Sequence, residues 1–187
     1  MTKGEALRDR TAAAIIDSAA TILAERGEGA SMEEIASAAG IGRATLYRYF
    51  PNREELLEAM AAASIQELAA RIKEAHLDAV SFEEAIARLA RAIIATGSKY
   101  IALNGDSAKY TDAYPDFDVE VTEPIRALFR RAIADGYLRE DLPPDLLMDL
   151  FSGLIKGALD ATASGREGIE ETASAVTTVF LRGARPS

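Results

Sequence analysis

The chain has 187 residues and no cysteine, which excludes a disulfide framework, a thiolate metal site and a cysteine nucleophile. Its net charge of −9 argues at first against a nucleic-acid partner, because DNA binding depends on neutralising phosphates. The charge is uneven, however: residues 1–53 hold seven Lys or Arg and seven Asp or Glu, so the whole acidic excess follows them. A neutral first segment can meet DNA while an acidic remainder stays away from it.

The N-terminal residues predict a short polar arm and then a helix. Residues 1–8 are mostly polar, and the charges nearby leave no signal-peptide core or membrane span. We therefore expect a cytoplasmic protein without membrane contact. Residues 9–26 place their apolar side chains on one helical stripe, which Gly27 ends. This helix is expected to support the elements that follow it.

The next stretch predicts two short helices joined by a glycine turn. Ser31 and Glu34 have the spacing of a capping box at the start of the first helix. Gly40 ends that helix, since glycine tolerates the left-handed conformation. The second helix is predicted over residues 43–50 and ends before Pro51, because proline disfavours helical geometry in the residue before it. Two short helices around a glycine turn are typical of a helix-turn-helix.

A long helix is predicted to follow the motif. Asn52 and Glu55 repeat the capping-box spacing and open a helix from residue 53 to about residue 75. Such a helix can carry motion from the helix-turn-helix into the rest of the chain. His76, the only histidine, falls in a polar turn, where a solvent-exposed position is far more common than a metal ligand. We therefore predict no metal site.

Another helix is predicted after Ser81, and the character of its core-facing stripe changes along its length. Seven positions fall within about a 100° arc at helical spacing: Ile86, Leu89, Ile93, Thr96, Gly97, Tyr100 and Asn104. The first three are aliphatic, whereas the last four are polar, aromatic or small. Such a stripe is typical either of a helix end that emerges into solvent or of a cavity wall with hydrogen-bonding groups. The sequence leaves both interpretations open.

The C-terminal part predicts three more helices, so the fold class is expected to be all-α. The first carries an amphipathic pattern from Val121 to Asp135-Gly136, and the others are expected over residues 144–164 and 167–181. The last two are apolar beyond one stripe, and Gly153 and Gly157 leave a flat strip on the first of them. These features favour burial against a partner chain, with a larger intrachain core as the alternative.

The run IASAAGIGRATLYRYFPNREEL, residues 35–56, resembles the DNA-binding motif of the TetR family of transcriptional regulators. The spacing agrees throughout at ten positions: Ile35, Ala36, Ala39, Gly40, Thr45, Leu46, Tyr47, Tyr49, Phe50 and Leu56. Gly42 stands where a serine is frequent in the family, and Arg53 stands where a lysine is usual. The close resemblance covers about the first third of the chain, and the remainder is similar in layout only.

The resemblance implies a two-domain organisation and a regulatory function. Residues 1–53 would form a three-helix DNA-binding domain, and residues 54–187 a helical domain for effector binding and dimerisation. The family typically dimerises through its last two helices, here residues 144–181. The expected protein is a homodimeric repressor that binds a palindromic double-stranded operator and is released by a small hydrophobic effector.

The second helix of the motif is predicted to enter the major groove. Base-edge contacts are expected from four residues, because arginine can donate two hydrogen bonds to one guanine: Arg43, Ala44, Thr45 and Arg48. Phosphate contacts are expected from three others: Tyr47, Tyr49 and Arg53. Ser31, the predicted helix cap, completes the DNA-binding set.

An effector cavity is predicted where the changing stripe meets the aromatic residues of the later helices. A mostly apolar cavity with a few polar anchors is typical of small-molecule sites. The residues expected to line it are Thr96, Gly97, Tyr100, Asn104, Phe129, Met148 and Phe151.

Two other classes of function were weighed against this one. An enzyme needs a nucleophile, an acid–base pair, a metal cluster or a phosphate loop, and no such motif is present, so we expect no catalysis and no cofactor. The acidic run at residues 116–120 lacks the glycine and the final glutamate of a calcium loop. A helical interaction protein would leave Arg43, Tyr47, Arg48 and Tyr49 without a purpose.

Overall fold

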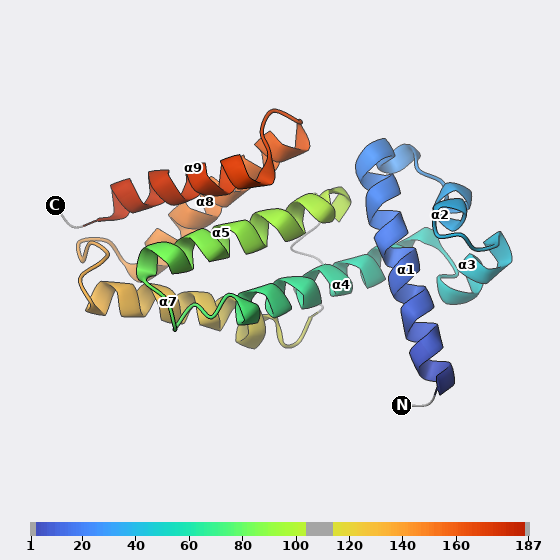
Figure 1. Ribbon diagram of the computed structural model, residues 1–187, viewed down its shortest axis with the longest axis horizontal. Helices are drawn as coiled ribbons and strands as arrows, with labels where there is room; N and C mark the ends of the chain where they lie inside the picture. Colours follow the sequence, from blue (N-terminus) through green and yellow to red (C-terminus); the bar gives the residue numbers. More distant parts are fainter. Residues whose placement is uncertain (1–2, 104–113, 186–187) are drawn as a thin grey trace. The chain divides into compact units, whose positions relative to one another are not determined.

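The computed structural model describes residues 3–103 and 114–185, and these ranges contain helices and turns but no strand (Figure 1). The predicted all-α fold is therefore confirmed. Contacts divide the chain into two compact units, which we call the head (Met1–Ser64 and Lys99–Ala113) and the body (Ile65–Ser98 and Tyr114–Ser187). Within the described ranges, no helix has both the length and the apolar run needed to cross a bilayer.

The head is built from three N-terminal helices and the beginning of a fourth. These are α1 (Lys3–Arg26), α2 (Met32–Ala38), α3 (Arg43–Tyr49) and the first half of α4 (Arg53–Glu74), with short 3-10 turns at Gly27–Gly29 and Ile101–Leu103. The polar arm predicted for residues 1–8 is wrong from Lys3 onward, because α1 begins there. Glu, Ala, Leu and Arg at positions 5–8 are among the strongest helix formers, and they extend the helix although their side chains are mostly polar.

Local start and stop signals form as predicted in the head. The Ser31 hydroxyl accepts a hydrogen bond from the Glu34 amide at 3.2 Å, and the Glu34 carboxylate accepts one from the Ser31 amide at 2.9 Å. Gly40 has a φ of +67°, the left-handed conformation that ends α2. The Glu55 amide donates to the side-chain oxygen of Asn52 at 2.9 Å, which caps α4.

The core of the head includes the start of α4. Leu56 and Met60 are fully buried in the same cluster as Ile15, Ile35 and Leu46. Contacts therefore place the boundary between the compact units inside α4, whereas the sequence-based division follows the end of the motif. As functional domains, residues 1–53 and 54–187 stay a prediction.

The body contains the second half of α4 and four further α-helices. These are α5 (Phe82–Lys99), α7 (Glu123–Ala134), α8 (Pro144–Ala163) and α9 (Ile169–Ala184), and a π-helical turn at Asp118–Thr122 leads into α7. The three C-terminal helices agree with the predicted ranges to within a few residues at their ends. Gly136, with a φ of +74°, stands in the turn after α7 as expected.

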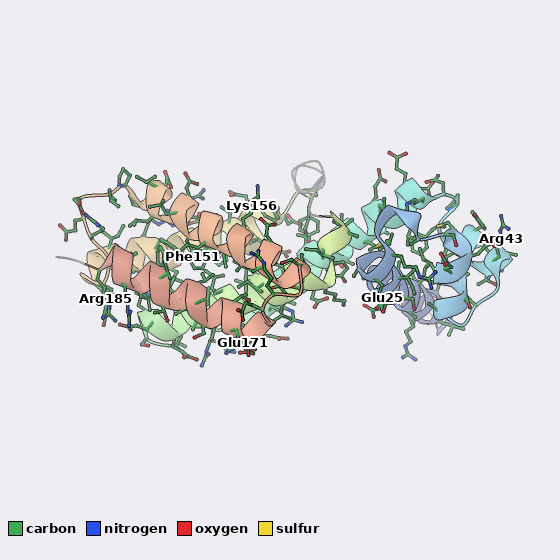
Figure 2. All side chains as sticks on the ribbon, turned by 90° about the horizontal axis from the view of Figure 1, so that it is seen from above. Glu25, Arg43, Phe151, Lys156, Glu171 and Arg185 are labelled. Atoms are coloured by element: carbon green, nitrogen blue, oxygen red, sulfur yellow. The ribbon has the colours of Figure 1, made fainter. Side chains whose placement is uncertain are left out.

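Aromatic side chains form the centre of the body. The rings of Phe129, Phe151 and Phe180 come from α7, α8 and α9, and their centroids lie 5.1–5.9 Å apart. Each ring is at most 4% exposed, and Phe151 points into the interior in Figure 2. Edge-on packing of this kind adds about 0.5–1.5 kcal/mol per pair beyond burial. The cluster joins the last three helices of the chain.

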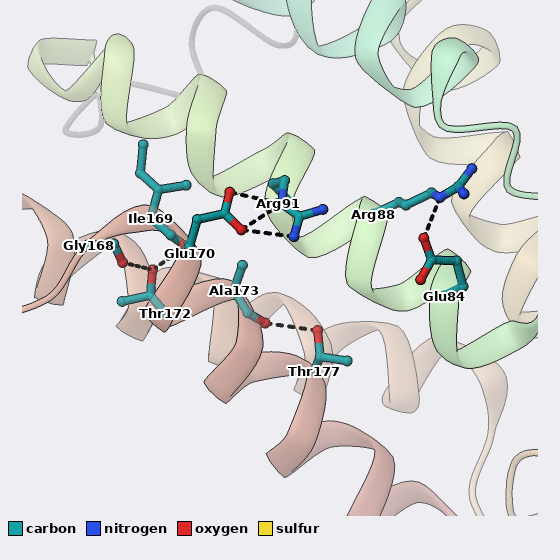
Figure 3. A network of polar contacts seen from close by, with 9 residues as sticks. All are labelled: Glu84, Arg88, Arg91, Gly168, Ile169, Glu170, Thr172, Ala173 and Thr177. Carbon is teal, nitrogen blue, oxygen red and sulfur yellow. Dashed lines mark hydrogen bonds and ion pairs between the residues drawn. The ribbon is translucent and has the colours of Figure 1, made fainter.

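A surface ion pair links α5 to α9 at the side of this core. The Arg91 Nε atom lies 2.9 Å from both carboxylate oxygens of Glu170 (Figure 3). Both side chains are more than half exposed, so the pair adds at most about 1 kcal/mol. Both helices also contribute buried apolar side chains to the core of the body, and this burial stabilises the body more than the bridge does.

The stripe predicted to continue along α5 is divided between the two cores. The helix ends at Lys99, so helical spacing no longer applies to Tyr100. Tyr100 is 4% exposed and packs in the core of the head, whereas Thr96 and Gly97 belong to the body. Asn104, the last predicted member of the stripe, lies outside the described residues.

Candidate nucleic-acid interface and effector site

The helix α3 presents one polar face and buries the other. Leu46 is fully buried and anchors the helix to the core of the head. Three of the predicted DNA-binding residues on α3 are exposed: Arg43, Ala44 and Arg48. The other three are half-buried: Thr45, Tyr47 and Tyr49. The structure thus brings the predicted α3 residues onto one helix at the surface, and their individual roles stay predictions.

Arg43 has partners within the protein. Its guanidinium forms an ion pair with Glu33 of α2 and lies 5.5 Å from the centroid of the Tyr47 ring (Figure 2 labels Arg43). Both members of the ion pair are more than 60% exposed, so breaking it costs at most about 1 kcal/mol. A base edge or a phosphate can therefore compete with Glu33 for this guanidinium.

Ser31 and Arg53 both make contacts within the protein. The cap formed by Ser31 was predicted from the sequence, and the contact of Arg53 was not. Ser31 is exposed, and its hydroxyl is engaged as the cap of α2. Arg53 is half-buried and donates to the carbonyl oxygen of Ala30, which ties the start of α4 to the loop before α2. Arginine has five N–H donors, so Arg53 retains donors for a second acceptor.

The hydrogen bonds of the Ser31–Glu34 capping box also set the charge state at this end of α2. Backbone and side-chain bonds from Ser31, followed by the nearby Arg26, lower the pKa of the Glu34 carboxyl below its usual value. Glu34 is consequently ionised at neutral pH. Its negative charge at the helix N-terminus complements the helix dipole.

A small hollow lies between α1 and α3, where no site was predicted. Its volume is about 280 Å³, and it is lined by Leu7 and Arg8 from α1 and by Arg48 and Tyr49 from α3. The Arg48 guanidinium lies 5.8 Å from the centroid of the Tyr49 ring. A polar arm can reach phosphates, so a DNA contact of Arg8 was open from the sequence, but its position was not predictable, because only a helix fixes Leu7 and Arg8 beside α3.

The residues predicted to line an effector cavity mostly fill space. A side chain at Gly97 would meet Leu159, whose Cδ2 atom lies 2.7 Å from the position of the missing Cβ. Phe129 and Phe151 are buried in the ring cluster, and Met148 is partly buried against the same core. The space beside Gly97 is thus occupied by Leu159 and is not an open cavity. A role of the predicted residues in effector binding stays a prediction.

Thr96 is the unusual member of that set. It is 4% exposed, and its hydroxyl has no hydrogen-bond partner among the described residues. The neighbouring Ser98 hydroxyl shares this condition. An unpaired buried hydroxyl is unfavourable. These two hydroxyls therefore agree with the prediction that this part of α5 offers hydrogen-bonding groups, but they do not identify a ligand.

A larger cavity opens elsewhere in the body. Its volume is about 710 Å³, and its walls come from the second half of α4, the turn after it, Tyr114 and the region from Glu120 to Arg131. The deepest side chains are buried and apolar: Ile72, Leu77 and Leu128. Sequence reasoning missed this cavity because its walls come from two segments about 50 residues apart.

Polar groups at the rim of this cavity hold its walls in place. The Tyr114 hydroxyl donates to the Glu120 carboxylate at 3.0 Å, and this bond raises the pKa of Tyr114. Arg131 donates to the carbonyl oxygen of Leu77 at 2.6 Å, which attaches α7 to the turn after α4. An apolar floor with a few polar groups at its rim is typical of small-molecule sites.

The surface of α8 and α9 carries exposed apolar side chains. Leu146, Leu150 and Val179 are 42%, 51% and 57% exposed. Gly153 and Gly157 lie on the same side of α8 as the two leucines, and a Cβ at either glycine would meet nothing within 4 Å. The predicted strip is therefore open and apolar, as a surface for another chain requires.

Fold and surface together define a class of protein: an all-α protein with an N-terminal helix-turn-helix and a separate helical body. Comparison with known proteins gives the family. Residues 15–60 match the model of the bacterial regulatory proteins of the tetR family. The chain is 30% identical over 163 residues to the HTH-type transcriptional repressor LfrR of Mycolicibacterium smegmatis, covering 84% of this chain and 82% of LfrR.

Other comparisons agree over most of the chain. The HTH-type transcriptional repressor AcnR of Corynebacterium efficiens is 26% identical, and the match covers 90% of this chain and 91% of AcnR. The crystal structure of LfrR in complex with proflavine superposes with a TM-score of 0.75 at 26% identity, covering 95% of this chain and 99% of that one. The chain therefore belongs to the TetR family, and it is a DNA-binding transcriptional regulator and not an enzyme.

Proposed function

We propose that the chain is a ligand-responsive repressor that binds a palindromic operator as a homodimer and acts in the cytoplasm. The observation that carries this proposal is the construction of α3. Its buried Leu46 fixes the helix to the head, while Arg43, Ala44 and Arg48 face solvent. A recognition helix needs both properties, because it must be held rigidly while its outer side chains reach base edges.

The roles on the interface follow from the chemistry of each group. Arg43, Ala44 and Thr45 stand at the N-terminal end of α3, which is the end that usually meets base edges. Tyr47, Tyr49 and Arg53 have donors suited to phosphate oxygens. Ser31 supports this arrangement as the cap of α2.

Dimerisation is proposed through residues 144–181. The exposed Leu146, Leu150 and Val179, with the open strip at Gly153 and Gly157, favour a second copy as their partner. A two-fold dimer would present two α3 helices to successive major grooves about 34–36 Å apart.

The effector is proposed to be a small hydrophobic molecule that binds in the 710 Å³ cavity of the body. We favour this cavity over the predicted space beside Gly97, because Leu159 fills the latter. The known relative LfrR has been solved with proflavine, which supports a small-molecule ligand here. The effector would contact α4, which also contributes Leu56 and Met60 to the core of the head. Its effect on DNA is limited by its differential affinity for the two states.

Selection of bound duplexes from a random pool tests the DNA proposal. We expect a palindrome whose half-sites are one helical turn, or a multiple of it, apart. Sedimentation of the same sample should give a dimer. A monomer that binds a palindrome tightly, or a pool that yields no enriched sequence, would contradict the proposal.

A matched pair of substitutions tests the effector cavity. Ala70 and Ala62 are both exposed on α4, but only Ala70 lines the cavity. Ala70→Phe should fill the cavity and abolish binding of proflavine, the first probe, while Ala62→Phe leaves it unchanged. Operator affinity should survive both changes. If both variants bind proflavine as tightly as the unchanged protein does, the effector does not bind in this cavity.

A further inference from the structure

The arginines of the described residues fall into two groups. Most have an oxygen partner in the protein, as in the pairs of Arg26 with Glu34 and Arg139 with Asp141. Within residues 3–103 and 114–185, four have no hydrogen bond or ion pair to an oxygen: Arg8, Arg10, Arg48 and Arg182. A guanidinium without a partner in the protein is available to an external anion.

Two of these four converge on one place. Arg8 from α1 and Arg48 from α3 line the 280 Å³ hollow of the head, and the other lining residues are Leu7 and Tyr49. None of the four lining residues is acidic. Two like charges that share a hollow without a carboxylate repel each other, and an anion between them removes that repulsion. Among the side chains that the structure describes, the hollow thus has two guanidinium groups and no carboxylate, so it can accept an anion.

The other residues that line the hollow are suited to a nucleotide, which has a sugar beside its phosphate, more than to a free ion. Tyr49 is half-buried, and its ring lies against the Arg48 guanidinium, which holds that side chain in place. Leu7 is 65% exposed and lines the hollow beside the two cations. A phosphate can accept from the two guanidinium groups, while the apolar Leu7 side chain contacts the adjoining deoxyribose.

The hollow is also continuous with the proposed recognition surface. Arg48 and Tyr49 stand at the C-terminal end of α3, away from the N-terminal residues that are proposed to meet bases. Arg8 is fixed there because α1 is helical from Lys3, which makes it a rigid part of the head. An element outside the helix-turn-helix therefore adds a cation to its edge.

We propose that Arg8 and Arg48 together hold one phosphate of the operator backbone, with Leu7 against its sugar. This inference rests on the proposed DNA-binding function. It adds α1 to the interface, and it changes the expected role of Arg48 from reading a base edge to positioning the head on the duplex. Phosphate contacts of this kind set register and orientation but carry no sequence information.

The test measures operator affinity as a function of salt concentration for Arg8→Gln, Arg48→Gln and the double variant. Arg10→Gln is the matched control, because Arg10 is about 200° from Arg8 around α1 and does not line the hollow. Each neutralised phosphate contributes about 0.9 to the slope of log K against log salt. If both arginines hold one phosphate, the double variant should lose about 0.9 in total, whereas two separate phosphates would give about 1.8.

Arg8→Gln and Arg48→Gln should each weaken binding by a similar factor on every operator variant, and Arg10→Gln should change neither slope nor affinity. An unchanged slope for the double variant, while the original protein binds its operator, would overturn this inference alone. A change of base preference in Arg48→Gln would also overturn it. Failure of the original protein to bind any duplex would instead contradict the proposed function.

A titration with inorganic phosphate tests whether the hollow binds a free phosphate ion instead of a phosphate of the DNA backbone. A titration followed by NMR, against chloride at matched ionic strength, should show at most weak binding, because a free ion lacks the duplex that positions it. Saturable phosphate binding that Arg8→Gln abolishes, together with an unchanged DNA salt slope, would identify a site for free phosphate and overturn the proposal. All variants change exposed side chains, and circular dichroism should give unchanged helix content.

Discussion

The head and the body use their arginines differently. In the body, most guanidinium groups have an oxygen partner within the protein: Arg91 pairs with Glu170 across two helices, and Arg131 donates to the Leu77 carbonyl. In the head, Arg8 and Arg48 line a hollow and have no oxygen partner among the described residues, and the partner of Arg43 is exposed. Composition alone conceals this difference, because residues 1–53 contain equal numbers of acids and bases. Nucleic-acid affinity depends on which cations are left unpaired, and much less on net charge.

The two units also differ in where they leave apolar surface. The body exposes Leu146, Leu150 and Val179, whereas exposed large apolar side chains of the head are limited to Leu7 among the described residues. The body is therefore suited to a protein partner and the head to a charged one. This contrast predicts the outcome of four experiments.

The largest effect is expected from removing a core side chain of one unit. Leu46→Ala should destabilise the head by about 2–5 kcal/mol, since Leu46 is fully buried. The mirror change is Leu147→Ala, because Leu147 is 1% exposed in the core of the body. Amide hydrogen exchange should show lost protection mainly in the unit that was changed. Equal loss in both units for both variants would show that the two cores are not separate.

Next in size is the loss of the proposed dimer. Gly157→Leu should fold, because a side chain there meets nothing within the chain, but it should weaken dimerisation at least tenfold, about 1.4 kcal/mol, by separating the two copies. Ser152→Leu is the control, since Ser152 is exposed on another side of α8. Sedimentation equilibrium measures both. A dimer constant that Gly157→Leu leaves unchanged would remove residues 144–181 from the interface.

A smaller effect in the opposite direction is expected from Glu33→Gln. This change removes the exposed partner of Arg43 and frees its guanidinium for DNA. Operator affinity should rise up to about fivefold, the equivalent of at most about 1 kcal/mol. Glu25→Gln is the control, because it removes the same charge from an exposed position of α1, and Glu25 has no ion pair or hydrogen bond of its side chain among the described residues. Affinity that rises equally in both variants would indicate a general charge effect and no competition at Arg43.

The smallest effect concerns the cap of α2. The hydrogen bonds from Ser31 lower the pKa of Glu34 in the folded protein relative to its ordinary value of 4.5. This stabilisation is present above the unfolded pKa and is lost as the pH falls through the folded pKa. NMR titration should find Glu34 titrating below 4.5, with faster amide exchange at the start of α2 in acid. A titration at or above 4.5 would contradict it.

Features that depend on a few neighbouring residues were predictable from the sequence. The capping box at Ser31, the left-handed Gly40 and the buried Leu46 all follow from short patterns. The start of α1 was not predictable from the sequence, because an irregular polar segment and a polar helix can have the same composition. The position of Tyr100 was not predictable either, because α5 ends one residue before it and its side chain packs in the head.

The candidate sites also differ in how far they could be predicted from the sequence. The surface residues of α3 were predictable, because they lie within one motif. The hollow between α1 and α3 and the cavity between α4 and α7 were not, since each joins segments that lie about 40–50 residues apart. The space beside Gly97 could not be recognised as filled, because its occupant Leu159 is more than 60 residues away.

The ion pair between Glu33 and Arg43 has a consequence for the search along a genome. A regulator meets very many wrong sites for each operator, and it must leave them quickly. If Arg43 meets DNA as proposed, Glu33 would compete with any phosphate that Arg43 encounters, so it would shorten each stop at a random sequence. A guanine in the right place accepts two hydrogen bonds from the same guanidinium and can displace the carboxylate. In the proposed complex, an acidic side chain beside α3 would therefore lower affinity slightly and make the search faster.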